Sequence, residues 1–274
     1  MISMGTVWDR TTEFLSDNIA AVLPIALLAI FLPSAISQSL APLSKGAGSG
    51  AVLIQIVSLG LSIVSLWGQL SISALALDPI AGRSAATAHA ARRLPAVIGL
   101  SIIILVGVML LLLPFVVVLV SAGYDFQTAM NGGNAEVPAG VGGFLGIYSL
   151  LFLCIMLWLG SRLALISPIV LMEGRWLGAF ARSFKLTRRI MWKMIGVIIL
   201  YAIIWFVSFL AAKLVFGAVF AMIAGGEGPV TTGSVLASIL VSFVLVLFSV
   251  FASAFIAKLY LAVRDAREAI VDSL

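Results

Sequence analysis

The most concentrated chemical groups in this chain are cations between residues 173 and 193, in the stretch EGRWLGAFARSFKLTRRIMWK. The stretch begins with one acid, Glu173, and its cations are Arg175, Arg182, Lys185, Arg188, Arg189 and Lys193. Guanidinium and ammonium groups bind phosphates and carboxylates. Long apolar runs precede and follow the stretch, so the anions within its reach are membrane lipid headgroups. The residue types predict binding of anionic phospholipid; an interpretation in which the charges only set membrane topology stays open.

Two further cations, Arg162 and Lys213, lie within apolar runs. A charge at the centre of a bilayer costs about 2.5–3.5 kcal/mol on insertion scales, so such residues mark either a paired site or a membrane interface. Residues 144–161 and 194–212 are each long enough almost to span the hydrocarbon layer before the cation is reached. We therefore favour an interface anchor for Arg162, with a bend near Pro168, over contact with a transported substrate. For Lys213 we favour an ammonium that reaches the outer surface, neutralised by an outer-loop acid, over a buried site.

Groups that would support catalysis or metal binding are missing from the sequence. His89 is the only histidine and Cys154 the only cysteine, which excludes an intrachain disulfide and a Cys-rich metal site. We expect His89 to be solvated in a polar loop. The sequence contains no phosphate-binding glycine loop, nucleophile elbow or HExxH motif, and no acid within the core of an apolar run. We therefore expect no enzyme activity, no metal and no cofactor.

The elements that carry these residues follow from composition. Hydrophobic residues make up 62% of the 274 residues and charged residues 10%, and the mean hydropathy is +1.23. A soluble core does not need so much apolar surface, whereas uncharged runs of about 20 residues are typical of transmembrane helices. The chain is predicted to be an all-α, polytopic membrane protein, one domain over residues 1–274. The six predicted spans are residues 19–37, 51–77, 96–122, 144–172, 194–224 and 234–257.

Three segments outside the spans have an amphipathic or charged character. If residues 5–17 form a helix, one face is apolar and the other charged, which predicts a helix lying at the membrane surface. Residues 173–193 are predicted to form a basic interfacial helix, and residues 258–274 an inner tail. Along the basic helix one stripe is apolar and largely aromatic: Trp176, Phe180, Phe184, Thr187 and Met191.

The distribution of cations predicts how the chain is threaded. The connection at residues 78–95, predicted to be a loop, carries Arg83, Arg92 and Arg93, and it lies on the same side as residues 173–193. Outside the apolar runs, Lys45 is the only Lys or Arg on the other side. Since loops rich in Lys and Arg stay in the cytoplasm, both termini are predicted to be cytoplasmic. The basic residues adjoin membrane spans, so the sequence pI of about 9.7 does not indicate nucleic-acid binding.

Small residues recur at helical spacing within the spans. This pattern is typical of close helix packing and leaves oligomerisation as an alternative. The residues concerned are Ser58, Ser62 and Ser65, the pair Gly142 and Gly146, and Ser249, Ser253 and Ala257.

A longer motif begins at Arg162, continues through Pro168 and Glu173, and then follows the pattern A-x-x-R-S-aromatic-x-L-T-R over residues 179–188 before Trp192. This motif resembles the membrane-domain family fused to some bacterial glycerophosphodiester phosphodiesterases, and the stand-alone YciC-type inner-membrane proteins. The tail at residues 257–264 and the amphipathic N-terminal segment are similar to the YciC type as well. The resemblance implies a six-helix, non-catalytic module of the bacterial inner membrane, with any phosphodiesterase activity in a separate soluble domain. The chain ends shortly after Arg264, so we expect no such domain here.

Together these features predict a non-catalytic inner-membrane protein that interacts with anionic phospholipid. It would serve as a scaffold or as a lipid-handling or assembly partner, with another membrane protein or a second copy as its companion. The alternative is a transporter of a small molecule or lipid, with a path near Arg162 and kinks at Pro114 and Pro168.

Overall fold

The computed structural model describes residues 3–43, 49–130, 137–138, 140–188, 190–224 and 231–271. All regular structure in these ranges is helical, and six helical segments are long and apolar enough to cross a membrane. They are Ile19–Leu40, Ser49–Leu77, Gly82–Ser121, Gly142–Glu173, Met191–Phe220 and Thr232–Glu268. The all-α, polytopic prediction is confirmed.

The first crossing changes its helical geometry near two prolines. It consists of α2 (Ile19–Ile25), the π-helix η1 (Ala26–Phe31) and α3 (Leu32–Leu40). Pro33 has no N–H to donate to the carbonyl four residues earlier, and the turn before it is widened. The N–H of Leu32 accordingly donates to the carbonyl of Leu27, five residues back.

Helices α4 (Ser49–Leu77) and α5 (Gly82–Ser121) are joined by a short turn, so the loop predicted over residues 78–95 is largely helix. Gly82, with a φ of +76°, permits the turn, and its N–H donates to the Pro79 carbonyl at 3.3 Å. The alanine-rich sequence that follows is a strong helix former, which explains why α5 begins well before the predicted span at residue 96.

The fourth predicted span, residues 144–172, is divided into α7 (Gly142–Leu163) and α8 (Ile166–Glu173). Pro168 explains the division, because its ring clashes with the carbonyl of the residue four positions earlier and it has no N–H to donate. Within α8 the proline occupies the first turn, where a backbone N–H has no helical partner. The bend predicted near Pro168 is present.

The basic helix predicted over residues 173–193 is also divided, and this prediction was wrong in treating it as one element. Gly174 ends α8 in the left-handed conformation, with a φ of +63°, and its N–H donates to the Val170 carbonyl at 3.2 Å. Residues 178–187 form the short helix α9 (Gly178–Thr187), and α10 (Met191–Ala224) begins after a second turn.

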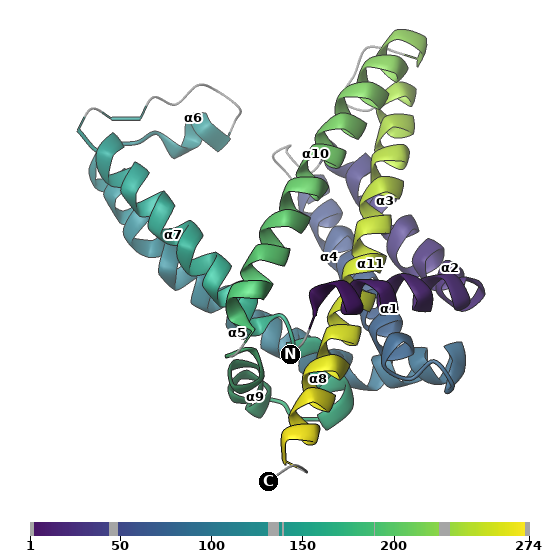
Figure 1. The fold of residues 1–274 in the computed structure, drawn as a ribbon. Coiled ribbons are helices and arrows are strands. Elements are labelled where there is room, and N and C mark those ends of the chain that lie inside the picture. The colour runs from purple at the N-terminus through teal and green to yellow at the C-terminus, as the bar shows by residue number, and fades with distance from the viewer. Residues whose placement is uncertain are drawn as a thin grey trace.

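The last crossing, α11 (Thr232–Val271), continues as a helix through most of the predicted tail. The amphipathic α1 (Met4–Asp17) lies across it (Figure 1). Helix α1 buries Val7, Thr11 and Phe14, while its charged residues are exposed. The Trp8 and Phe251 rings are 4.4 Å apart, and the Lys258 ammonium lies 4.7 Å from the Phe14 ring. From Thr232 to Phe251 the helix rises about 28 Å, close to the thickness of the hydrocarbon layer.

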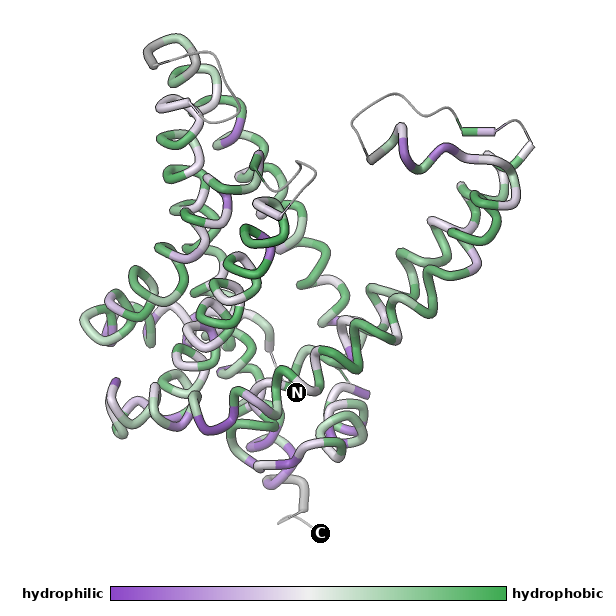
Figure 2. Tube along the Cα trace, turned by 180° about the vertical axis from the view of Figure 1, so that it is seen from behind, coloured by the Kyte–Doolittle hydropathy of each residue, from purple (hydrophilic) through white to green (hydrophobic). Residues whose placement is uncertain are grey.

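Helices α5 and α7 form one arm and α10 and α11 another, and the two arms diverge from a common base (Figure 1). Short helix α6 (Phe126–Met130) follows α5 at the tip of the first arm. The arms are apolar along their lengths (Figure 2). No residue in the most apolar stretch of α4 or of the segment containing α7 is buried, which fits surfaces that face lipid.

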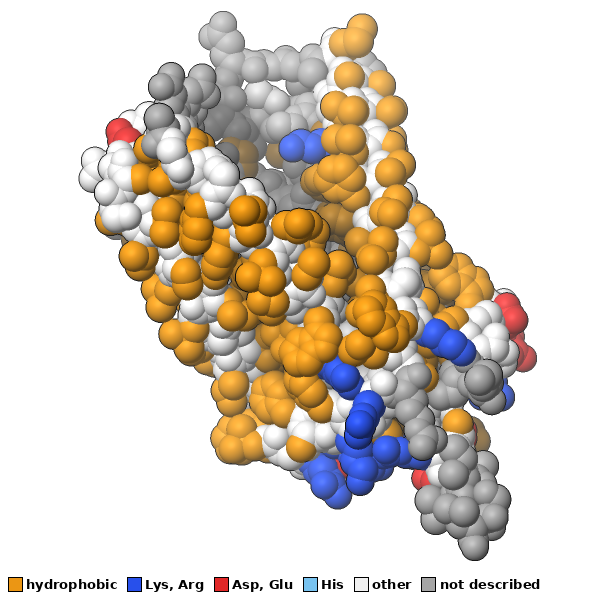
Figure 3. Space-filling view, turned by 60° about the vertical axis from the view of Figure 1, so that its left-hand side comes forward, with side chains coloured by type: hydrophobic (Ala, Val, Ile, Leu, Met, Phe, Trp, Pro, Cys, Tyr) orange, Lys and Arg blue, Asp and Glu red, His pale blue; other side chains and the backbone are white. Residues whose placement is uncertain are grey.

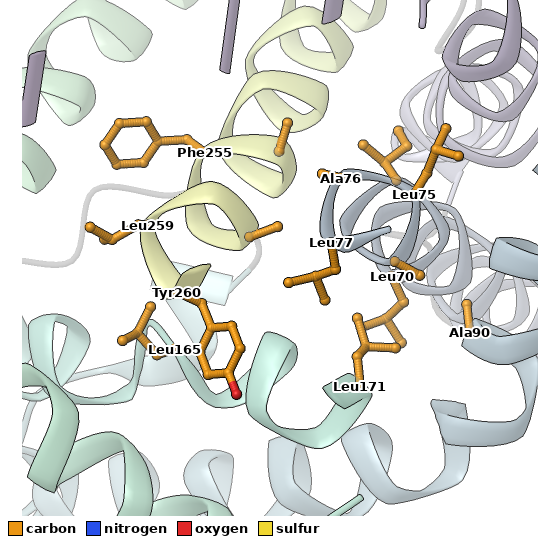
Figure 4. Packing of buried hydrophobic residues seen from close by; sticks show 14 of the residues in the cluster. Leu70, Leu75, Ala76, Leu77, Ala90, Leu165, Leu171, Phe255, Leu259 and Tyr260 are labelled. Atoms are coloured by element: carbon orange, nitrogen blue, oxygen red, sulfur yellow. The ribbon is translucent and has the colours of Figure 1, made fainter. Parts of the chain in front are cut away.

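The buried core lies near the base of the arms, where α4, α8 and α11 meet (Figure 4). Leu77, Leu171 and Tyr260 are among its members, and Tyr260 is only 1% exposed. The base of the arms, with α8, α9 and the C-terminal end of α11, is called the basic end.

Candidate anion-binding surface at the basic end

Most Lys and Arg side chains visible on one face of the molecule gather at its basic end, below a broad apolar surface (Figure 3). The chain between α8 and α9 is attached here to α5 by two close contacts. A Cβ added to Gly99 would lie 3.3 Å from the Trp176 indole nitrogen, and one added to Gly174 would lie 2.8 Å from an Arg93 guanidinium nitrogen. Glycine is favoured at 174 by its φ of +63°, whereas a side chain at Gly99 would displace the indole by a few tenths of an ångström.

Glu173 is the centre of a polar cluster that joins three helices. One carboxylate oxygen, Oε1, accepts hydrogen bonds from Arg182 Nε at 2.9 Å and from the Tyr260 hydroxyl at 3.1 Å. The other, Oε2, is 3.1 Å from Arg175 Nε. The Glu173 side chain is 18% exposed, Arg182 31% and Arg175 61%. We call these four residues the Glu173 cluster; it fastens α9 to α8 and α11.

Arg162 fastens the other side of α9. Its Nη1 donates to the Phe184 carbonyl at 3.2 Å, and its guanidinium carbon is 5.8 Å from the centroids of the Trp158 and Phe184 rings. Its own carbonyl accepts from the Ser183 hydroxyl at 2.5 Å. Within the described residues, Arg162 Nε is buried without a hydrogen-bond partner. These contacts favour an anchoring role for Arg162.

The face of α9 that packs inward differs from the predicted aromatic stripe. Its buried residues are Ala179, Ser183, Leu186 and Thr187. Trp176 is 56% exposed, and Phe180 and Phe184 are half-buried. Small residues at helical spacing allow close approach of two helices, and that pattern in residues 179–187 was a signal the sequence analysis did not use.

The cations assigned to lipid from the sequence therefore have two kinds of surroundings. Arg182 is held by Glu173, whereas Lys185 and Arg188 are exposed and Arg175 is mostly exposed. Lys193 is exposed at the start of α10, and Arg189 lies outside the described residues. We call Arg175, Lys185 and Arg188 the basic surface. Trp176, Leu177 and Trp192 lie close to it in sequence and are 56%, 60% and 78% exposed.

Lys213 is not part of this surface. It lies on α10 about 33 Å along the helix from Met191, with its ammonium 6.0 Å from the Phe209 ring. Of the acids expected to neutralise it, Glu227 lies outside the described residues, and Asp125 binds Thr128 instead. The Thr128 hydroxyl and backbone amide lower the pKa of Asp125 below its ordinary value.

His89 lies on α5 rather than in a loop, which corrects the prediction. Its Nε2 is 2.8 Å from the Leu171 carbonyl and so ties α5 to α8. A cavity of about 470 Å³ adjoins it, also lined by Asp78 and Arg92. Among the described residues there is no group of three or more His, Cys, Asp or Glu side chains that could hold a metal ion.

Tyr260 is the member of the Glu173 cluster that sequence reasoning missed as a site residue. It lies far from Glu173 in the chain, and nothing in its local pattern shows that its hydroxyl turns toward an acid.

Comparison of the chain with protein-family models, with curated proteins and with solved structures finds no match.

Proposed function

We propose that this multi-pass membrane protein binds anionic phospholipid headgroups with the basic surface and serves as a non-catalytic scaffold or lipid-handling partner. The observation that carries the proposal is the exposure of Arg175, Lys185 and Arg188 beside exposed tryptophans at one end of the membrane-spanning helices. Tryptophan is favoured at the membrane–water interface, and cations there are attracted to anionic headgroups.

The Glu173 cluster and Arg162 support this function by holding α9 in place. A preorganised surface loses less conformational freedom on binding than a mobile segment does. Arg182 contributes through its contact with Glu173, so we assign it a positioning role rather than direct contact with lipid.

We further propose that the basic end faces the cytoplasm in a bacterial inner membrane, with both termini on that side. The proposal rests on the concentration of Lys and Arg in the connections at this end, since such loops are retained in the cytoplasm. The resemblance over residues 162–192 supports the bacterial location. Transport past Arg162 is the second candidate, but the contacts of its guanidinium are those of helix packing, and it does not line the cavity beside His89.

Native mass spectrometry of the purified protein tests the lipid proposal. Each Lys or Arg near an anionic surface contributes about 1 kcal/mol, so Lys185→Gln with Arg188→Gln should weaken cardiolipin or phosphatidylglycerol retention by about tenfold to thirtyfold. Retention of phosphatidylcholine should not change. The matched control pair is Lys185→Gln alone against Lys213→Gln, which removes the same charge about 33 Å along α10 from Met191. Equal retention of anionic lipid by these two single variants would contradict the proposal.

A further inference from the structure

A second polar site lies within the membrane-spanning part of the molecule, away from the basic surface. An open cavity of about 510 Å³ lies between α3, α4 and α11. Volumes of this size are typical of small-molecule sites. Neutral hydrogen-bonding side chains line it from all three helices, and no charged residue is among them. We call it the hydroxyl-lined cavity.

Helices α3 and α4 each contribute three polar side chains, and α11 contributes one. They are Ser34, Ser37 and Gln38 on α3, Ser62, Ser65 and Gln69 on α4, and Ser249 on α11. Ser65 lies about 18 Å from the C-terminal end of α4, and Ser249 about 25 Å from the N-terminal end of α11. The cavity therefore lies within the hydrocarbon layer, and Ser249 is close to its boundary on the side of the basic end.

Several of these groups have no partner in the protein. Gln38 donates to the Ser242 hydroxyl at 2.8 Å and Ser62 to the Ser58 carbonyl at 2.8 Å. In the part of the chain that is described, the side chains of Ser34, Ser37, Ser65 and Gln69 make no hydrogen bond. Polar groups left unpaired in a bilayer are costly, so these four partly exposed side chains favour a polar occupant.

The geometry around the cavity restricts that occupant. Without a cation in its lining the cavity offers nothing to neutralise a phosphate, which disfavours charged lipids and solutes. Ser62 is exposed on α4, and its neighbours Leu59 and Ile63 are 64% and 38% exposed. The α4 wall therefore opens toward lipid, so the occupant enters from the bilayer.

The α3 wall has an irregular backbone beside this opening. Ile30 lines the cavity and belongs to the π-helix η1. A Cβ added to Gly68 of α4 would lie 2.8 Å from Ile30 Cγ1 and from Ala29 Cβ. Close contact at Gly68 and the widened turn of η1 hold the two helices together just beside the polar side chains. Such π-helical turns occur frequently at functional sites.

We infer that the hydroxyl-lined cavity binds an uncharged, hydroxylated headgroup carried by a membrane lipid, of the chemical class of diacylglycerol. The glycerol hydroxyl and ester carbonyls pair with Ser34, Ser65 and Gln69, while the acyl chains stay among the exposed apolar residues of α4. This site shares no residue with the basic surface.

The test uses the full-length protein in phosphatidylcholine nanodiscs doped with dioleoylglycerol. The triple variant Ser34→Ala, Ser65→Ala, Gln69→Leu should retain about tenfold less dioleoylglycerol than wild type, as expected for the loss of two or three hydrogen bonds. Gln55→Leu is the matched control, because Gln55 is exposed on the same helix and does not line the cavity. Cardiolipin retention should be unchanged in both variants, which separates this inference from the proposed function.

A second measurement does not depend on the triple variant folding. In a Cys154→Ala background, Ser65→Cys is labelled with methyl methanethiosulfonate, and dioleoylglycerol should slow the labelling. Slower labelling with xylitol but not with dioleoylglycerol would overturn the lipid source and assign the same hydroxyl recognition to a free polyol. Unslowed labelling with both probes, or equal dioleoylglycerol retention by wild type and a folded triple variant, would overturn the inference and leave a water-filled cavity.

Discussion

Replacing Glu173 by glutamine should release α9 from the rest of the basic end. Glu173 accepts hydrogen bonds from Arg182 and Tyr260 and is paired with Arg175. A hydrogen bond to a charged group contributes about 1.5–3 kcal/mol, whereas a largely exposed ion pair such as that with Arg175 contributes about 0–1 kcal/mol. Glutamine keeps one neutral acceptor but cannot serve both donors equally well. We therefore expect a local loss of about 2 kcal/mol.

Hydrogen exchange followed by mass spectrometry measures this loss where it occurs. Amides of residues 178–187 should exchange about thirtyfold faster in Glu173→Gln, since each 1.4 kcal/mol changes a local opening equilibrium tenfold. Amides in the buried parts of α4 and α11 should keep their protection, because Leu70 and Leu259 are each 2% exposed and belong to the apolar core.

Two further variants distinguish the contributions. Tyr260→Phe removes only a hydroxyl and should accelerate exchange about fivefold, whereas Arg175→Gln should have almost no effect because its side chain is 61% exposed. Unchanged exchange of residues 178–187 in Glu173→Gln would contradict the claim that Glu173 fastens α9. So would an effect of Arg175→Gln as large as that of Arg182→Gln.

Two other predictions concern helix contact and threading. Gly68→Ala should destabilise the protein by about 1–3 kcal/mol in thermal unfolding, because the added methyl would meet Ala29 and Ile30 at 2.8 Å; Gly60→Ala, which has open space on the same helix, should be neutral or stabilising. A cysteine at Arg188 in a Cys154→Ala background should be inaccessible to a membrane-impermeant thiol reagent added outside intact spheroplasts. Labelling there from outside would contradict the proposed cytoplasmic side.

Some helix boundaries have local signals in the sequence. Pro168 divides the fourth span and Gly174 ends α8, and both effects follow from the residue type and its immediate neighbours. The alanine-rich start of α5 is of the same kind. Periodicity alone did not separate α9 from α10, because the cations and aromatic residues continue at helical spacing through the turn.

The contacts of the site residues, unlike these helix boundaries, have few local signals in the sequence. Exposure of Lys185 and Arg188 fits the charge pattern, but Glu173 Oε1 accepts from both Arg182 and Tyr260, and Tyr260 approaches from the other end of the chain. The serine stripes of α4 and α11 were predicted as helix-packing faces. Helices α3 and α4 had to meet each other and the distant α11 before the unpaired side chains of Ser34, Ser65 and Gln69 shared one cavity.

The all-α membrane class, the six apolar helices and the uneven distribution of Lys and Arg among the connections all follow from the amino-acid sequence. These depend on the hydropathy and charge of single segments, because each span must satisfy its own backbone in hydrocarbon. Tertiary packing, by contrast, sets the contacts of individual side chains. It determines which cations are bound by Glu173 or Phe184, which cations are exposed, and where neutral polar side chains meet. Those outcomes depend on which helix faces meet, and a serine or arginine has the same local signal whether its partner is a carboxylate, a carbonyl or an empty cavity.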